Sequence, residues 1–435
     1  MTLNDTILKE DKSFVWHPFT QMQTASDPLV IIEAKDSTLL TSDGKKYLDC
    51  NSSWWVNIHG HGHPHLKQAL IQQFDLIDHV IFAGATHPKA VELARRVVGL
   101  LPSKLEKVFF SDDGSTSVEV ALKMVFQYWF NKEIPKKRIV ALDGAYHGDT
   151  FGAMSISQRG CFNEPFEHLF FAVDYLDFPF LENEASVLSM ADHLFSKGDC
   201  AALILEPLIQ GSAGMRIYSA SFLEELVNIA SKYDVLVVFD EVMTGWGRTG
   251  ELFACNHLSV QPDIICLSKG LTGGVLPLGL TVATNSIYDA FLAPEKTKAL
   301  LHGHSFTGNA LACALACANI DLIEKNSFQE SINRISLAHS NFLITLKGNL
   351  AVRTSQLGTI LVIEILEENT SSYFSSIRDR AYQFFLDLGL LIRPLGNIVF
   401  LNPPYCMSNI ELEKCYSGIQ LFLNVLAEER TSKTK

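Results

Sequence analysis

Short apolar runs rich in Val and Ile alternate with longer amphipathic segments between about residues 100 and 285. Runs of this length and composition are typical of buried strands, and the segments between them are long enough for helices, as at 116–130. Alternating strands and helices form a mostly parallel sheet with helices on both faces. The pattern therefore predicts an α/β fold with strands at 107–110, 138–142, 200–205, 234–240 and 263–267.

The last third of the chain has a different pattern. An Ala-rich apolar helix is expected at 308–325, followed by further helices and by short strands at 358–364 and 397–401. Because 435 residues exceed what one small core can organise, we expect more than one domain. We predict a large domain over 61–310, a smaller α+β domain over 311–435, and an N-terminal segment over 1–60 that packs with the smaller domain.

An acid and a lysine follow two of the predicted strands. Asp240 ends one run, and Lys269 comes two residues after the next. Ligands of open α/β sheets bind outside the carboxyl ends of the strands, so both side chains are expected in one cleft. Pyridoxal phosphate needs a lysine that binds it as a Schiff base and a carboxylate on its ring nitrogen. Taken alone, such an Asp is more often a helix cap and such a Lys a solvated side chain.

A possible phosphate site lies where a helix follows a strand. Backbone N–H groups at Gly114 and Ser115, together with the helix dipole, are suited to an anion. Thr116 and Glu119 have the spacing of a capping box, so a capped helix without a ligand is the alternative. After another strand, Tyr146 could stack on an aromatic cofactor, or simply lie in a loop.

Three further segments carry candidate chemistry. Ser305 lies in a turn before the Ala-rich helix and could donate to a phosphate, or cap that helix. Arg393 could bind a substrate carboxylate, although a structural ion pair is the usual role of an arginine. The histidines at 59, 61, 63 and 65 alternate with Gly and Pro, which indicates a turn, and we predict no metal site there.

Composition narrows the classes of function. A net charge of −13 argues against a nucleic-acid or anionic-membrane surface. Apolar runs are too short to span a bilayer, and the first residues lack the apolar core of a signal peptide. Nine cysteines occur without Cys-x-x-Cys pairs, which is typical of a reduced, cytoplasmic protein.

Together these segments resemble the fold-type-I, class III pyridoxal phosphate aminotransferases over nearly the whole chain. The segments that carry the resemblance are Phe239–Val242, Gly245–Gly250, Pro262–Asp263 and Ser268–Gly270. The resemblance implies a large domain with a mostly parallel seven-stranded sheet, a smaller α+β domain, and a homodimer with shared active sites.

Within the class, the chain is similar to members that convert 8-amino-7-oxononanoate to 7,8-diaminononanoate in biotin synthesis. This similarity lies in Trp16–Thr20, Asn51–Trp55, Tyr146–Gly152, Arg393–Pro394 and Leu401–Tyr405. For the cofactor, it implies that Lys269 carries it, Asp240 holds its ring nitrogen and Tyr146 stacks on its ring. Its phosphate would be bound by Gly114 and Ser115, and by Ser305 from the neighbouring subunit. For the substrate, the similarity implies that Arg393 binds the carboxylate and that the pocket is lined by Trp54, Trp55, Phe19, Phe400 and Gly303.

The amino donor is less well defined. Phe19 and Phe400 stand where members that use S-adenosylmethionine often carry Tyr, and the segment around Gly303 is similar to that of relatives that use lysine. Those relatives tend to lose the first Trp of the pair, and Trp54 is present. We therefore expect S-adenosylmethionine as donor. Three alternatives remain. The donor could be lysine, the enzyme could carry out another class III reaction on an ω-amino acid or diamine, or the chain could be a regulatory protein that binds the cofactor without turnover.

Overall fold

The structure, a computed structural model, describes residues 2–349, 351–366 and 375–433. A seven-stranded sheet has the order β4-β12-β11-β10-β7-β5-β6. β12 runs antiparallel to its neighbours, and the other pairs are parallel. The predicted mostly parallel seven-stranded sheet is thus confirmed. Its strands are β4 (Leu105–Ser111), β5 (Arg138–Leu142), β6 (Val173–Leu176), β7 (Cys200–Leu205), β10 (Leu236–Asp240), β11 (Ile264–Leu267) and β12 (Gly279–Thr284).

Helices cover both faces of this sheet, because successive strand residues point to opposite sides. In β10, Val238 packs with the helices of one face and Phe239 with those of the other. The first face is covered by α5 (Gly114–Asn131), α6 (Phe151–Ile156) and α9 (Asn285–Asp289). The second is covered by α4 (Pro88–Leu100), α7 (Glu184–Phe195), α8 (Ala220–Lys232) and α10 (Ala310–Ile323).

The predicted Ala-rich helix is α10, and it positions the segment that begins with Lys269. α10 packs against α3 (Pro64–Phe74), α4 and the short 3-10 helix η3 (Lys269–Thr272). The buried Asn319 of α10 donates from Nδ2 to the carbonyl oxygens of Gly270 (2.9 Å) and Leu271 (3.0 Å). The small Ala side chains let the elements approach closely, and the amide then fixes the backbone that follows Lys269.

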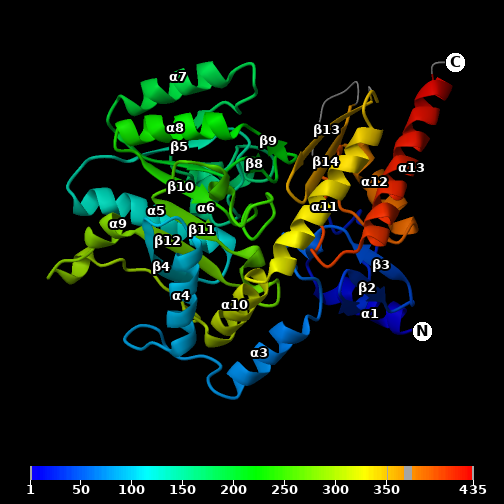
Figure 1. Cartoon of the computed structure of the whole chain (residues 1–435), viewed down its shortest axis with the longest axis horizontal. Helices are drawn as coiled ribbons and strands as arrows, with labels where there is room; N and C mark the ends of the chain where they lie inside the picture. The colour runs from blue at the N-terminus through cyan, green and yellow to red at the C-terminus, as the bar shows by residue number, and fades with distance from the viewer. Residues whose placement is uncertain (1, 350, 367–374, 434–435) are drawn as a thin grey trace.

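The N-terminal and C-terminal parts of the chain lie on the same side of the molecule, at the right of Figure 1. β3 (Lys46–Asp49) of the N-terminal segment pairs in parallel with β15 (Leu390–Leu391), which brings Asn51–Trp55 beside Arg393. β1 (Ile31–Lys35) and β2 (Thr38–Thr41) complete this sheet. The N-terminal segment therefore contacts the C-terminal part, while the exact domain boundaries stay predictions.

The C-terminal part contains a three-stranded antiparallel sheet, flanked by helices (Figure 1). Its elements are β13 (Val352–Leu357), β14 (Ile360–Ile365), β16 (Ile398–Leu401), α11 (Asn326–Thr345), α12 (Ser376–Asp387) and α13 (Asn409–Lys433). The remaining elements are short or peripheral: α1 (Leu3–Phe14), α2 (Ser52–Trp55), β8 (Ile209–Gln210), β9 (Arg216–Ile217), η1 (Glu164–Leu169), η2 (Ala254–His257) and η4 (Lys296–Lys298).

Candidate active site

Four neighbouring strands each bring a polar side chain to the same edge of the sheet. In spatial order the strands are β11, β10, β7 and β5. Asp240 ends β10, and its parallel partner in β11 is Cys266, three residues before Lys269. Glu206 directly follows β7, and Tyr146 lies in the loop after β5. The structure thus brings the predicted Lys269, Asp240 and Tyr146 to one edge, together with a second carboxylate.

Asp240 is held as a buried hydrogen-bond acceptor. Only 4% of it is exposed. Its Oδ2 lies 2.7 Å from Nδ1 of His147, and its Oδ1 accepts from the backbone N–H of Val242 at 3.0 Å. His147 is buried as well, and its Nε2 has no hydrogen-bond partner among the described residues. The contact with His147 fixes the orientation of the carboxylate.

Lys269 occupies an unusual backbone position beside an indole ring. Its φ of 45° lies in the left-handed region, which costs free energy for a residue with a side chain. Its Nζ lies 5.2 Å from the centroid of the Trp55 ring. Burial lowers the pKa of the Lys269 amine, and the carboxylates of Asp240 and Glu206 partly oppose this effect. The lowered pKa makes the neutral, reactive amine more accessible than for a solvated lysine.

A capping box is present at the start of α5, but it is not formed by the predicted pair of Thr116 and Glu119. Asp113 is the N-cap: its Oδ1 accepts from the Thr116 N–H at 2.8 Å, and Thr116 Oγ1 accepts from the Asp113 N–H at 3.1 Å. Glu119 instead accepts from Thr150, Gly152 and the backbone N–H of Ala153. Local spacing suggested the wrong pair because the partners of Glu119 lie some thirty residues away along the chain.

Two backbone donors remain open at the start of α5. Within the described part of the chain, the N–H groups of Gly114 and Ser115 have no acceptor, as is usual in the first turn of a helix. The Ser115 hydroxyl is engaged, because Oγ lies 2.7 Å from Thr150 Oγ1 and Thr150 in turn donates to Glu119. A Cβ on Gly114 would lie 2.6 Å from Val242 Cγ1, so a glycine lets this helix end approach the segment after Asp240. An anion can bind there through the backbone.

Aromatic rings connect Lys269 to Arg393. Trp54 and Trp55 stack with their ring centroids 5.4 Å apart, and the Arg393 guanidinium lies 5.2 Å from the Trp54 ring. Asn51 Oδ1 accepts from the backbone N–H of Arg393 at 3.0 Å and so fixes the backbone at Arg393. Arg353 and Arg380 pair with glutamates, whereas no ion pair found among the described residues includes Arg393. Its charge is available to a carboxylate at the end of this row of aromatic side chains, which we call the aromatic slot.

Two of the predicted pocket residues, Phe19 and Gly303, and the predicted phosphate-binding Ser305 lie away from this cluster in the single chain. Phe19 is 54% exposed and packs edge-on against Phe162 at 6.4 Å. Gly303 and Ser305 lie in an exposed turn, in which the Ser305 carbonyl accepts from His79. Phe400 is fully buried and contacts Trp55 edge-on at 6.1 Å, so any effect on a substrate passes through that indole. The roles of these residues stay predictions.

Sequence analysis missed three polar residues of this region. His147 and Glu206 follow predicted strands, as Asp240 does, and this shared position was the signal that could have found them. Arg248 is 1% exposed and donates to the carbonyl oxygens of Pro403 (2.8 Å) and Trp55 (3.2 Å). Its contacts span distant parts of the chain, and spacing alone could not indicate them.

The four neighbouring histidines have separate partners. His59 lies 2.8 Å from Asn319 Oδ1, His61 2.8 Å from Asp49 Oδ2, and His65 2.9 Å from Asp321 Oδ2. His63 caps α3. In the ranges that the structure describes, no group of three or more His, Cys, Asp or Glu side chains could hold a metal ion.

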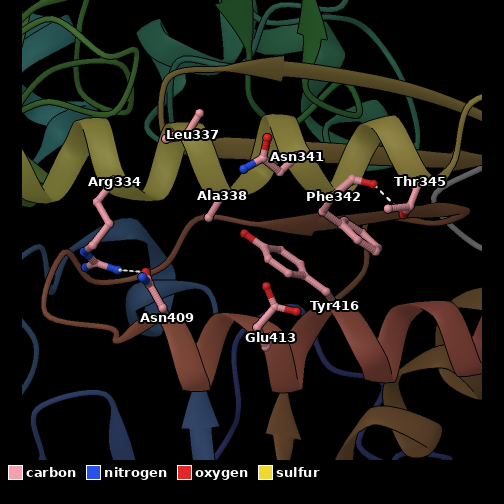
Figure 2. Close-up of a pocket in the computed structure, with 9 residues that line it drawn as sticks. All are labelled: Arg334, Leu337, Ala338, Asn341, Phe342, Thr345, Asn409, Glu413 and Tyr416. Carbon is pink, nitrogen blue, oxygen red and sulfur yellow. Dashed lines mark hydrogen bonds between the residues drawn. The ribbon is translucent and has the colours of Figure 1, made fainter.

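A surface hollow of about 510 Å³ lies apart from this site, between α11 and α13 (Figure 2). Arg334, at one end, donates to Asn409 Oδ1 and to the carbonyl oxygens of Tyr405 and Met407. Its charge is therefore used to join the two helices and the loop before α13. The hollow holds none of the residues at the strand ends.

Comparison with known proteins agrees with this geometry. A family model described as aminotransferase class-III matches residues 21–423. A protein of Synechococcus elongatus named adenosylmethionine-8-amino-7-oxononanoate aminotransferase is 45% identical over 93% of this chain and 97% of its own. The crystal structure of the Methanocaldococcus jannaschii protein of that name is 34% identical, with a TM-score of 0.90 over 96% of this chain and 99% of the other.

A solved amine transaminase of an uncultivated Pseudomonas species, in a PLP-bound form, is 27% identical and has a TM-score of 0.85. It covers 94% of this chain, which covers 97% of it. No helix among the described residues is long and apolar enough to cross a membrane.

Proposed function

The chain belongs to the class III aminotransferases, and from this premise we propose that it is a pyridoxal phosphate enzyme that transfers an amino group to 8-amino-7-oxononanoate. The product would be 7,8-diaminononanoate, and the donor S-adenosylmethionine. The observation that carries the proposal is the pairing of a buried, hydrogen-bonded Asp240 with a Lys269 of lowered pKa at the ends of adjacent parallel strands.

The residues present fit pyridoxal phosphate. The open N–H groups of Gly114 and Ser115 would hold its phosphate, Asp240 would hold its ring nitrogen, and Tyr146 would cover its ring. When bound, the cofactor supplies an electron sink for the bond broken at the donor carbon. Asp240 would keep a proton on the ring nitrogen. The Lys269 amine would move a proton from the donor carbon to the cofactor in the first half of the reaction, and from the cofactor to the acceptor carbon in the second half.

The slot between Lys269 and Arg393 suits the proposed acceptor. 8-Amino-7-oxononanoate has a carboxylate at one end, an apolar chain, and a ketone at the other end. Arg393 would bind the carboxylate, and the stacked indoles of Trp54 and Trp55 would lie along the chain. The same rings could contact a sulfonium donor through cation–π attraction.

Replacing Arg393 with Met should raise the KM for 8-amino-7-oxononanoate at least about tenfold. A hydrogen bond to a charged group is worth roughly 1.5–3 kcal/mol, and Met keeps much of the side-chain length. Steady-state kinetics at saturating donor would measure the change. Arg353→Met is the matched control, because Arg353 is exposed and pairs with Glu364 away from the slot. An unchanged KM in the Arg393 variant would remove this residue from the acceptor site.

We propose S-adenosylmethionine over lysine as donor because Trp54 shapes the slot, whereas Phe at positions 19 and 400 lacks only a hydroxyl. A lost hydrogen bond costs about 1 kcal/mol, so Phe19→Tyr should lower the KM for S-adenosylmethionine about fivefold. The test mixes each donor with the cofactor-loaded protein and follows the deaminated donor by mass spectrometry. Conversion of lysine but not of S-adenosylmethionine would refute the proposed donor, but not the proposed aminotransferase activity.

We also propose a homodimer in which Ser305 of each chain reaches the phosphate of the partner. The turn that contains Ser305 is exposed, and large apolar side chains flank it, with Leu301 at 72% and Phe306 at 61% exposure. His304 Nδ1 lies 4.0 Å from Asp112 Oδ2, so this turn lies near the start of α5 in its own chain. Such a surface is typical of a contact between proteins.

A further inference from the structure

Glu206 is a buried carboxylate that the proposed reaction leaves unused. It is 5% exposed and lies at the end of β7, between the strands that carry Asp240 and Tyr146. Its Oε1 accepts from the Tyr146 N–H at 3.2 Å, and its Oε2 accepts from the Gly211 N–H at 2.9 Å. None of the ion pairs recorded for the described residues includes Glu206. Carboxylates are rarely buried without a paired cation, so this one needs an explanation.

Several charged or titratable groups face Glu206. Asp240 lies at the end of β10, and Tyr146 and His147 lie in the loop after β5. Lys269 begins η3 after β11; its Nζ lies 5.2 Å from the centroid of the Trp55 ring, and a Cβ on Gly211, whose N–H donates to Glu206, would lie 3.4 Å from that same ring. Arg216 lies in β9, and Tyr218 directly follows that strand. Burial is the main cause that raises the pKa of Glu206, and His147 and the two backbone N–H groups lower it, while Asp240 raises it; the net pKa is about 7. Arg216 does not pair with Glu206, because its Nη2 donates to Asp143 O and Gln210 Oε1.

We propose that Glu206 is a positioning residue of the active site, which fixes the backbone at Tyr146 and whose negative charge favours the protonated amine of Lys269. The proposal rests on the proposed function, in which that amine must both take and return a proton. Burial disfavours the ammonium form, and a nearby carboxylate favours it. With the cofactor bound, Asp240 would hold the proton of the ring nitrogen, which would leave Glu206 as the carboxylate that offsets the burial of Lys269.

The effect of Glu206 on Lys269 depends on pH. Above pH 7 Glu206 is mostly ionised and raises the pKa of Lys269; below pH 7 it is mostly protonated, and this support is lost. Removing the charge should therefore lower the pKa of Lys269. A purely structural Glu206 would leave the pKa of Lys269 where it is, since Gln can still accept one of the two backbone hydrogen bonds.

The experiment uses the full chain freed of cofactor. Trace acetic anhydride labels Lys269 at a series of pH values, and peptide mass spectrometry gives the rate and hence the pKa of its amine. In Glu206→Gln the pKa should fall by roughly one unit, the low end of the effect of a nearby charge. Glu206→Asp keeps the charge and should recover most of the shift. Glu225→Gln, on the exposed side of α8, is the control and should change nothing.

Wild-type protein provides a test that does not depend on the folding of a variant. Its labelling curve for Lys269 should show a second inflection near pH 7, where Glu206 titrates. A curve with a single ionisation, or a folded Glu206→Gln variant with the wild-type pKa of Lys269, overturns the proposal. Neither substrate nor cofactor is present, so the result is independent of whether the protein aminates 8-amino-7-oxononanoate.

Discussion

Lys269→Ala should lose at least about a thousandfold in kcat, because in the proposed function the amine is both the attachment point of the cofactor and the base of the proton transfers. General acid–base catalysis alone contributes about 10²–10⁴-fold. Turnover at saturating donor and acceptor measures the loss. The exposed Lys296→Ala is the matched control and should keep wild-type activity.

The same lysine should carry the cofactor. Borohydride reduction of the loaded wild-type protein, followed by digestion and mass spectrometry, should place the reduced cofactor on the peptide that contains Lys269. The Lys269→Ala variant should show no such label. Recovery of the cofactor on another lysine would refute the assignment, whatever the activity of the variant.

Asp240→Asn should bind the cofactor but lose at least about 150-fold in kcat. A preorganised electrostatic contact of this kind is worth roughly 3 kcal/mol or more. Asn is nearly isosteric and can still accept from the Val242 N–H, so the fold should survive, but a neutral amide no longer stabilises a proton on the ring nitrogen. Cofactor retention is read from absorbance and activity from initial rates.

Asp192→Asn controls for the loss of a charge, since Asp192 pairs with Lys232 on the exposed surface between α7 and α8. It should cost little, as exposed ion pairs generally do. If the Asp240 variant retained activity within tenfold of wild type with cofactor bound, the role given to this carboxylate would be untenable.

The parts of the site that lie at strand ends could be predicted from sequence. Parallel strands align their carboxyl ends, so locating two apolar runs was enough to place Asp240 and Lys269 together. The fold class followed from the same alternation and is confirmed. Glu206 also directly follows a predicted strand, but a single carboxylate at that position does not by itself indicate a role.

Contacts between distant segments could not be predicted in this way. Asn51 holds Arg393 across 342 residues, and the pairing of β3 with β15 brings them together. Neither the spacing of residues nor the composition indicates which distant strands pair, or in which register. The capping box was predicted incorrectly for the same reason. Glu119 has the spacing of a capping-box residue, but it accepts hydrogen bonds from backbone N–H groups at the start of α6, which is distant in sequence.

The most direct test of the proposed function follows one nitrogen atom. The cofactor-loaded protein is mixed with 8-amino-7-oxononanoate and S-adenosylmethionine that carries ¹⁵N in its amino group, and the products are analysed by mass spectrometry. We expect 7,8-diaminononanoate with one ¹⁵N, and no product with the Lys269→Ala variant. If no labelled diamine forms with S-adenosylmethionine or with ¹⁵N-lysine, while the same preparation aminates an ω-oxo acid or an aldehyde, the proposed acceptor is wrong.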